Sequence, residues 1–237
     1  MTYYAIISTR EAPSKSNKTL CNLIDYFTLG HIFPYIMPGE KSIYEAYTKA
    51  LKEINPSPED IIILCHDDIE IISNQDNLKD ILKRELFYSS DLDYPGVAFV
   101  GVAGTTFLDK DAVWWEINRR KQGHHRGFVF QGKDSNSMTP NFFGLFNENV
   151  VVLDGCFLAT TGYILNRIRT EKPKEFTGDW DFYDLYYTLQ AFELGFSNKV
   201  VPIVIRHESN GELAGRKSWH ENRAAFMKMF RLPVKCR

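Results

Sequence analysis

One stretch of this chain, residues 61–72, constrains the possible fold more than any other. It reads IIILCHDDIEII, so an uninterrupted apolar run of the length of a buried strand ends abruptly in His66, Asp67 and Asp68. Such a run is typical of a strand that is covered on both faces. The three polar side chains therefore follow the strand at the edge where open α/β sheets bind their ligands.

Two adjacent carboxylates beside an imidazole favour a divalent cation at this strand end. Asp67 and Asp68 repel each other and are costly to bury unless a cation or a bound donor compensates. The alternative is that the triplet simply caps the strand as it enters a loop, and the triplet alone leaves both open. A second apolar run, residues 199–205, closes on Arg206 and His207. Two strand ends with complementary ligands favour one ion shared by Asp68 and His207.

The segments before residue 61 alternate between strand-like and helix-like patterns. The clearest helix follows Ser42, because Ser42 and Glu45 match a capping box and apolar residues recur at helical spacing up to Ile54. The predicted order is strand 3–8, helix 20–27 ending at Gly30, strand 31–37, helix 43–54 and strand 61–65. This alternation predicts an α/β fold with a Rossmann-like, mostly parallel central sheet and right-handed crossovers. No G-x-G-x-x-G follows the first strand, which argues against a dinucleotide.

After one more predicted helix and strand, the residue composition of the sequence changes. The predicted elements are a helix over residues 78–86 and a strand, VAFVGVAG, over residues 97–104. From Asp109 onward, turns, aromatic residues and a basic cluster at residues 119–121 predict a loop and hairpin excursion. The pair His124 and His125 is expected to have a structural or solvated role, because adjacent side chains on a strand point to opposite faces and do not share one ion.

The last third of the chain adds a broken strand and two helices. Residues 150–153 read as a buried strand that breaks at Asp154 and Gly155 and resumes as CFLAT, and a glycine there marks either a bulge or the close approach of another group, such as a sugar. The segment GDWDFYDLYYTLQAFELGF reads as a helix with Asp181 and Asp184 in its first turn, where the helix dipole favours carboxylates. A final helix carries Trp219.

Composition places the chain among ordinary globular proteins and excludes some partners. With 44% hydrophobic and 24% charged residues over 237 positions, it can bury a sizeable core. A formal net charge of −2 gives no global electrostatic case for nucleic acid or an anionic membrane, so recognition of phosphate must be local. The segment NGELAGRK, residues 210–217, suits either a mobile anion-binding flap or a solvated basic loop.

The cysteines and the apolar runs bear on the location of the protein. Four scattered cysteines without a CxxC pair suggest neither a zinc site nor a disulfide framework, which fits a reducing cytoplasm. No run is long enough to cross a bilayer, and the first residues lack a basic start. We therefore expect a cytoplasmic protein that is neither secreted nor membrane-spanning, with peripheral membrane contact left open.

Five strings of the sequence resemble the GT-A glycosyltransferases, specifically the family 2-like bacterial group that includes the streptomycin-cluster type. They are SIYEAYTKAL, IIILCHDDI, VVLDGCFLAT, WDFYDLYYTLQAFELGF and VVPIVIRHESNG. They follow the usual order of that family, and the resemblance that runs through them covers most of the chain. The resemblance implies a single GT-A domain over residues 1–237. Its nucleotide-sugar-binding half is expected at about residues 1–107, and its acceptor-binding half, which holds a smaller acceptor-side subregion, at about residues 108–237.

The resemblance also implies roles for particular residues. The HDD triplet takes the place of the family's D-x-D signature, so that Asp68 matches the metal-binding acid while His66 and Asp67 lie near the ribose and diphosphate. His207 matches the histidine that often completes the metal site. Asp184 matches the carboxylate that acts as the base in inverting members.

Further donor and acceptor contacts complete the expected site. Residues at the end of the first strand are placed to contact the nucleotide base or ribose, and two cations near the C-terminal helix are placed to close over the diphosphate; these are Thr9, Arg10, Glu11, Arg216 and Lys217. The residues expected to bind the acceptor are Asp154, Gly155, Trp180 and Asp181.

These residue types fit a single-displacement transfer of a sugar. Departure of a nucleoside diphosphate builds negative charge that a divalent ion stabilises; Mn or Mg suits oxygen ligands, and a histidine favours Mn. The acceptor hydroxyl has a pKa far above neutral, so a positioned carboxylate, Asp184, takes its proton and the configuration inverts. We therefore expect a hexosyltransferase that moves a sugar from a UDP-sugar to a glycan, lipid-linked or small-molecule acceptor.

Three other functions compete with this one. A catalytically idle GT-A scaffold that serves as a binding module is supported by two departures from the family, His66 where an Asp is usual and Tyr186 where relatives often carry a second Asp. A sugar-phosphate nucleotidyltransferase would need a glycine-rich loop after the first strand, and STREAPSKSNK has no glycine. An HD-type phosphohydrolase carries its His-Asp pair on a helix, whereas His66 and Asp67 follow a strand-like run.

Overall fold

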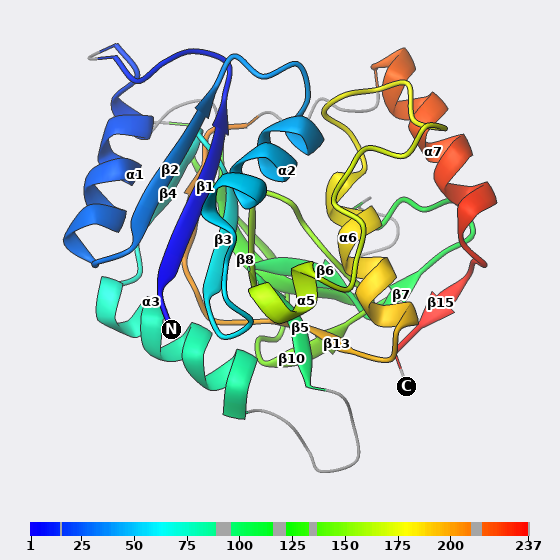
Figure 1. The fold of residues 1–237 in the computed structure, drawn as a ribbon. Helices are drawn as coiled ribbons and strands as arrows, with labels where there is room; N and C mark the ends of the chain where they lie inside the picture. Colours follow the sequence, from blue (N-terminus) through cyan, green and yellow to red (C-terminus); the bar gives the residue numbers. More distant parts are fainter. Residues whose placement is uncertain (15, 89–95, 116–121, 133–136, 210–214, 237) are drawn as a thin grey trace.

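The apolar strands predicted in the first half of the chain form part of a seven-stranded sheet (Figure 1). The computed structural model of the chain describes residues 1–14, 16–88, 96–115, 122–132, 137–209 and 215–236. In spatial order the strands are β10 (Glu148–Val150), β13 (Ser197–Val200), β5 (Val97–Gly101), β12 (Phe157–Thr161), β3 (Ile61–His66), β1 (Tyr3–Thr9) and β2 (Phe33–Pro38). Only β12 and β10 run against the other five, which confirms a mostly parallel α/β sheet.

Two helices cover opposite faces of the β1 and β2 edge. Helix α1 (Lys18–Leu29) connects β1 to β2, and α2 (Ile43–Ile54) connects β2 to β3 on the other side of β1. Because both crossovers are expected to be right-handed and lead in opposite directions, the two helices are placed on opposite faces, as Figure 1 shows. The predicted capping of α2 is confirmed in part, since the Ser42 hydroxyl accepts a hydrogen bond from the Glu45 backbone N–H at 3.0 Å. A third helix, α3 (Gln75–Lys83), continues as the π-helical turn η1 (Arg84–Tyr88).

A second sheet adjoins the C-terminal ends of several strands of the first sheet. Its strand order is β11 (Val152–Leu153), β6 (Ala103–Thr105), β8 (His125–Gln131), β14 (Ile205–His207) and β4 (Ile69–Ile71), and β9 (Thr139–Gly144) pairs with β8. The antiparallel β8–β9 pair confirms the predicted hairpin. His125 is buried against Trp114, with ring centroids 5.8 Å apart, while His124 is half-buried, which agrees with opposite orientations of the pair. A small sheet joins β7 (Phe107–Leu108) to β15 (Val234–Lys235).

Three apolar runs that we predicted as continuous strands each divide between the two large sheets. The run 97–104 splits into β5 and β6, the run 150–153 into β10 and β11, and the run 199–205 into β13 and β14. The residues at or beside these breaks, Val102, Val151 and Val201, are fully buried. The change of sheet therefore leaves no polar interruption in the sequence, which explains why the pattern did not reveal it.

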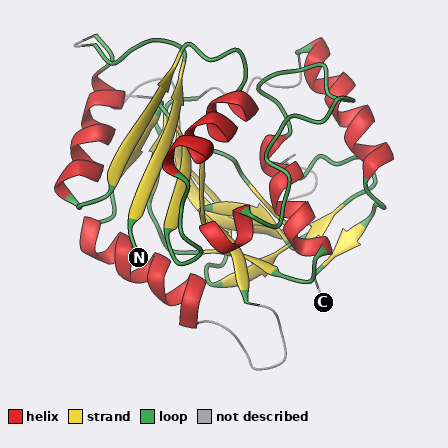
Figure 2. Cartoon of the chain, in the orientation of Figure 1, coloured by secondary structure: helices red, strands yellow, loops and turns green. Residues whose placement is uncertain are grey.

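The helix predicted from residue 178 onward begins later than expected. Helix α6 (Tyr183–Glu193) starts after Phe182, which has a φ of +68° and therefore cannot belong to a right-handed helix. Asp184 lies in the first turn as predicted, but Asp181 precedes the helix, so the prediction that both carboxylates share its first turn was wrong. The short helix α5 (Gly162–Leu165) follows β12, and the predicted C-terminal helix is α7 (Lys217–Met229). Figure 2 shows α7 at the edge of the molecule, beside α6.

Two predicted features fall outside the described residues. They are the basic cluster at residues 119–121 and residues 210–214 of the expected anion-binding flap. Within the described part of the chain, no helix is both long enough and apolar enough to cross a bilayer.

Candidate active site

A single cleft joins the ends of both large sheets and the start of α6. Its volume is about 1310 Å³, and its walls include Asp68, His207 and Asp184. These three residues are far apart in the sequence, and the sequence analysis placed them at opposite sides of one reaction. The structure brings them to the same cleft.

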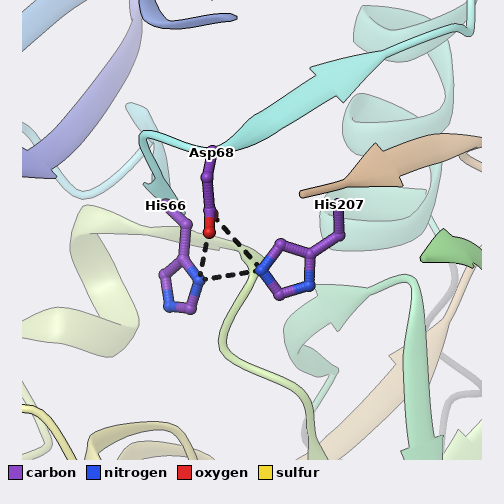
Figure 3. A group of neighbouring side chains, drawn as sticks. All are labelled: His66, Asp68 and His207. Carbon is purple, nitrogen blue, oxygen red and sulfur yellow. Dashed lines mark hydrogen bonds and ion pairs between the residues drawn. The ribbon is translucent and has the colours of Figure 1, made fainter. Parts of the chain in front are cut away.

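At the floor of this cleft, His66, Asp68 and His207 turn their polar atoms toward one another (Figure 3). The Oδ1 atom of Asp68 lies 3.3 Å from Nε2 of His207 and 3.7 Å from Nδ1 of His66. The two ring nitrogens are 3.4 Å apart. Among the described residues this is the one group of three or more histidine, cysteine and acidic side chains with ligand atoms close enough to hold an ion.

Strand pairing explains why these residues meet. His66 is the last residue of β3, and Asp68 lies in the tight turn that leads into β4. Strand β4 pairs antiparallel with β14, which places His207 opposite Ile69. The Glu208 backbone N–H donates a hydrogen bond to the Asp68 carbonyl at 2.8 Å. The turn that connects β3 to β4 therefore places Asp68 beside His66 of one sheet and His207 of the other.

The geometry of the cluster fits a divalent cation. Ligand atoms about 2.1 Å from one ion are separated by about 3.0–3.4 Å at octahedral or tetrahedral angles, and the three observed separations are close to this range. Oδ1 of Asp68 is also buried, and its neighbours in the cluster are the two imidazole rings, of which His207 pairs with it. An imidazole compensates a buried carboxylate charge only when it is protonated, and a bound cation would supply that compensation to neutral rings. One carboxylate and two imidazoles are a donor set suited to Mn or another transition ion.

The pKa values of the two histidines in the cluster are shifted in opposite directions. Burial works against the charge of Asp68, but the adjacent His207 and His66 outweigh it and lower the Asp68 pKa. Burial would lower the pKa of His207, yet its contact with Asp68 raises it overall. For His66, burial dominates and the pKa falls. A bound cation would have to displace any proton on His207, so affinity for the ion is expected to increase with pH.

Asp184 faces the same cleft from the first turn of α6. Its Oδ2 accepts a hydrogen bond from the Gly155 backbone N–H at 3.0 Å, and its Oδ1 accepts one from Leu185 at 2.8 Å. Burial raises the pKa of Asp184 to about 7, with a further contribution from the charge of Asp154, although the two backbone donors oppose the shift. A carboxylate with this pKa can take up a proton near neutral pH, which is the property required of a general base.

The backbone at Gly155 is approached by a protein group. A Cβ atom built at this position would lie 2.1 Å from the Tyr183 hydroxyl and 2.9 Å from Cβ of Asp184. Of the two explanations offered for this glycine, close approach is therefore supported, but the group that requires it in the structure is Tyr183 rather than a sugar.

The remaining predicted site residues divide into those that line the cleft and those that do not. The lining includes Arg10, Asp67, Asp154, Gly155, Trp180, Asp181 and Arg216. Three predicted donor contacts are not in the lining. Thr9 is 2% exposed, and its hydroxyl donates to the Glu11 carbonyl. The Glu11 side chain is exposed, and Lys217, also exposed, pairs with Glu221 on α7.

Several lining residues were not singled out from the sequence. Trp114, Trp115 and Trp219 line the cleft together with Trp180, so all four tryptophans of the chain face it. The concentration of aromatic residues after Asp109 was the available signal. Tyr183 also lines the cleft, but it has the spacing of an ordinary core residue of α6, and no local pattern marked it.

Comparisons with known proteins identify a family for the chain. The model of a glycosyltransferase-like family matches residues 34–229. Among solved structures, A197 from STIV superposes with a TM-score of 0.48 at 13% sequence identity, covering 87% of this chain and 85% of that chain. No curated protein matches. The family match spans the two strand ends, most of the cleft lining and α6, and the mixed α/β sheet flanked by helices is of GT-A type. The chain belongs to this glycosyltransferase-like family.

Proposed function

We propose that this protein is a metal-dependent, inverting glycosyltransferase that moves a hexose from a UDP-sugar to an acceptor hydroxyl. The observation that carries this proposal is that the His66–Asp68–His207 cluster and Asp184 line the same cleft. One group suits a diphosphate-bound cation, and the other suits removal of a proton. A cleft of about 1310 Å³ has room for a nucleotide sugar and part of an acceptor.

The donor end of the cleft is assigned to the cluster. Asp68 and His207, with His66 beside them, would hold Mn or Mg. The ion would stabilise the negative charge that develops on the departing diphosphate. Arg10 and Arg216 also line the cleft and supply positive charge for the nucleotide. Thr9, Glu11 and Lys217 remain donor-side predictions that require movement of the chain, since none of them lines the cleft.

The acceptor end is assigned to the residues around the start of α6. Asp184 accepts the proton of the attacking hydroxyl, and its two backbone hydrogen bonds fix the direction of its carboxylate. Asp154, Gly155, Trp180 and Asp181 surround this position in the cleft lining. A single displacement assisted by one base inverts the configuration of the transferred sugar. The acceptor class, glycan, lipid-linked or small molecule, and the predicted cytoplasmic location stay open.

The test separates donor binding from chemistry. Calorimetry should show that UDP binds in the presence of Mn²⁺, that Asp68→Asn weakens this binding at least tenfold, and that Asp184→Asn leaves it within about twofold. Transfer, or slow release of UDP from a UDP-sugar, should be lost in both variants. Asp76→Asn is the matched control, because Asp76 is an exposed carboxylate on α3 that is not part of the cleft lining.

Three outcomes would contradict the proposal. Transfer at the normal rate by Asp184→Asn would remove the assigned base. Tight binding of UDP and Mn²⁺ without turnover of any UDP-sugar in a panel would instead favour the idle GT-A scaffold, the alternative suggested by His66 and Tyr186. Binding of a sugar phosphate and a nucleoside triphosphate would favour a nucleotidyltransferase.

A further inference from the structure

Tyr183 makes two hydrogen bonds that together determine where its proton lies. Its hydroxyl is 2.8 Å from the carbonyl oxygen of Gly155 and 2.7 Å from Nε2 of His66. A carbonyl oxygen only accepts hydrogen bonds, so the single hydroxyl proton of Tyr183 is donated to Gly155. The same oxygen must then accept from His66, which requires a proton on Nε2 of that ring.

This assignment also determines the state of the other ring nitrogen of His66, Nδ1. In a neutral histidine with its proton on Nε2, the Nδ1 atom carries a lone pair. Nδ1 of His66 is the atom that faces the cluster, at 3.7 Å from Oδ1 of Asp68 and 3.4 Å from Nε2 of His207. We propose that Tyr183 is a positioning residue whose hydroxyl holds His66 in the tautomer that directs the Nδ1 lone pair into the cation site. The metal-binding part of this inference depends on the proposed function.

The surroundings of Tyr183 make it suited to this role. The side chain is 4% exposed, and its ring is flanked by Tyr44, Tyr47 and Tyr187 with centroids 5.8–6.3 Å away. These aromatic contacts leave little freedom for the ring. The absence of a Cβ at Gly155 allows the hydroxyl to approach the backbone there. Second-layer hydrogen bonds of this kind commonly set the orientation of histidine ligands.

The same peptide group also holds the proposed base. The Gly155 carbonyl accepts from Tyr183, while the Gly155 N–H donates to Oδ2 of Asp184 at 3.0 Å. A series of three hydrogen bonds therefore connects the donor side to the acceptor side, from His66 to Tyr183, from Tyr183 to Gly155, and from Gly155 to Asp184. Tyr183 would be important to the cation site without contacting the ion.

The first experiment reads the tautomer directly in the metal-free protein. Long-range ¹H–¹⁵N correlation spectra of the ¹⁵N-labelled protein at alkaline pH should show His66 protonated at Nε2, with its signals assigned by their loss in His66→Asn. In Tyr183→Phe, which keeps the ring and removes only the hydroxyl, the His66 signals should move toward a mixture of tautomers. A proton found on Nδ1 of His66 in the unaltered protein would overturn the inference, whether or not the variant folds.

The second experiment measures the consequence for the cation. Titration with Mn²⁺ alone should give a Kd about 10- to 100-fold weaker for Tyr183→Phe than for the unaltered protein. Tyr187→Phe is the matched control, because Tyr187 is a fully buried tyrosine of the same helix whose hydroxyl donates to the Thr170 carbonyl. Its Kd for Mn²⁺ should be unchanged.

The outcomes distinguish this inference from the proposed function. An unchanged Kd in Tyr183→Phe, with normal binding by the unaltered protein, would refute the role of Tyr183 and leave the metal centre intact. No binding of Mn²⁺ by the unaltered protein would refute the metal centre itself, and with it the ligand role of His66.

Discussion

At the scale of single residues, the Asp184 carboxylate lies where a negative charge is costly. Burial raises its pKa to about 7, whereas an Asp in an unfolded chain titrates at about 3.9. Between these two values the folded protein binds the proton and the unfolded chain does not. The contribution of this group to stability is therefore complete below about pH 4 and is lost as the pH rises through about 7.

Asp184→Asn should remove this dependence, because an amide does not titrate. Between about pH 5 and about pH 8, the free energy of unfolding of the unaltered protein should fall by on the order of 2 kcal/mol relative to the variant. Urea unfolding at the two pH values measures the difference. Asp76→Asn, whose side chain is 86% exposed, should follow the unaltered protein. If Asp184→Asn lost as much stability over this range as the unaltered protein, the pKa of Asp184 would not be raised.

At the scale of elements, the turn between β11 and β12 is held directly against the start of α6. A Cβ at Gly155 would lie 2.1 Å from the Tyr183 hydroxyl, 2.5 Å from Cζ of the same ring and 2.9 Å from Cβ of Asp184. Gly155→Ala should therefore destabilise the protein by about 1–3 kcal/mol through overpacking. It should also weaken binding of Mn²⁺, because the displaced tyrosine no longer holds His66.

A double-mutant cycle identifies the contact that is responsible. In a Tyr183→Phe background the nearest clashing atom is absent, so Gly155→Ala should cost less there than in the unaltered protein, with a coupling of about 0.5 kcal/mol or more. Thermal and urea unfolding of the four proteins supply the values. Strictly additive costs would mean that the turn relaxes away from α6 and that the two elements are not coupled through this hydroxyl.

The elements also show which features the sequence could predict. Strand β3 and the polar triplet after it follow from a local pattern, since five buried apolar residues end at three polar ones. The division of the later apolar runs between the two sheets could not be predicted from such a pattern, because Val102 and Val151 are buried at the junction of the sheets just as they would be within one strand.

The candidate site was predictable to a similar extent. The sequence predicted site roles for Asp68, His207 and Asp184, because ligand-type residues at strand ends and helix starts are unusual in an apolar context. The role of Tyr183 could not be predicted from the sequence. Its partners Gly155 and His66 are 28 and 117 residues away, and its place on α6 is that of an ordinary core aromatic residue. Only the packing of α6 against the strand ends gives its hydroxyl a role.

At the scale of the whole molecule, the proposed cation site lies on the junction of the two large sheets. His66 belongs to β3 in the seven-stranded sheet, and His207 belongs to β14 in the six-stranded sheet, with Asp68 in the turn between them. Separation of the sheets would therefore break the site, and a bound ion would oppose any such opening. A bound ion would thus link the stability of the two sheets.

Mn²⁺ at about 100 times its Kd should accordingly raise the free energy of unfolding by about 2.7 kcal/mol. Native-state hydrogen exchange should show the same slowing, about 100-fold, for amides of β3 and for amides of β4 and β14 that exchange through openings that separate the sheets. Asp68→Asn should abolish the effect in both sheets, and Asp76→Asn should preserve it. Slowing confined to β4 and β14 would show that the ion is released only when the second sheet opens, and His66 of the first sheet would then not be one of its ligands.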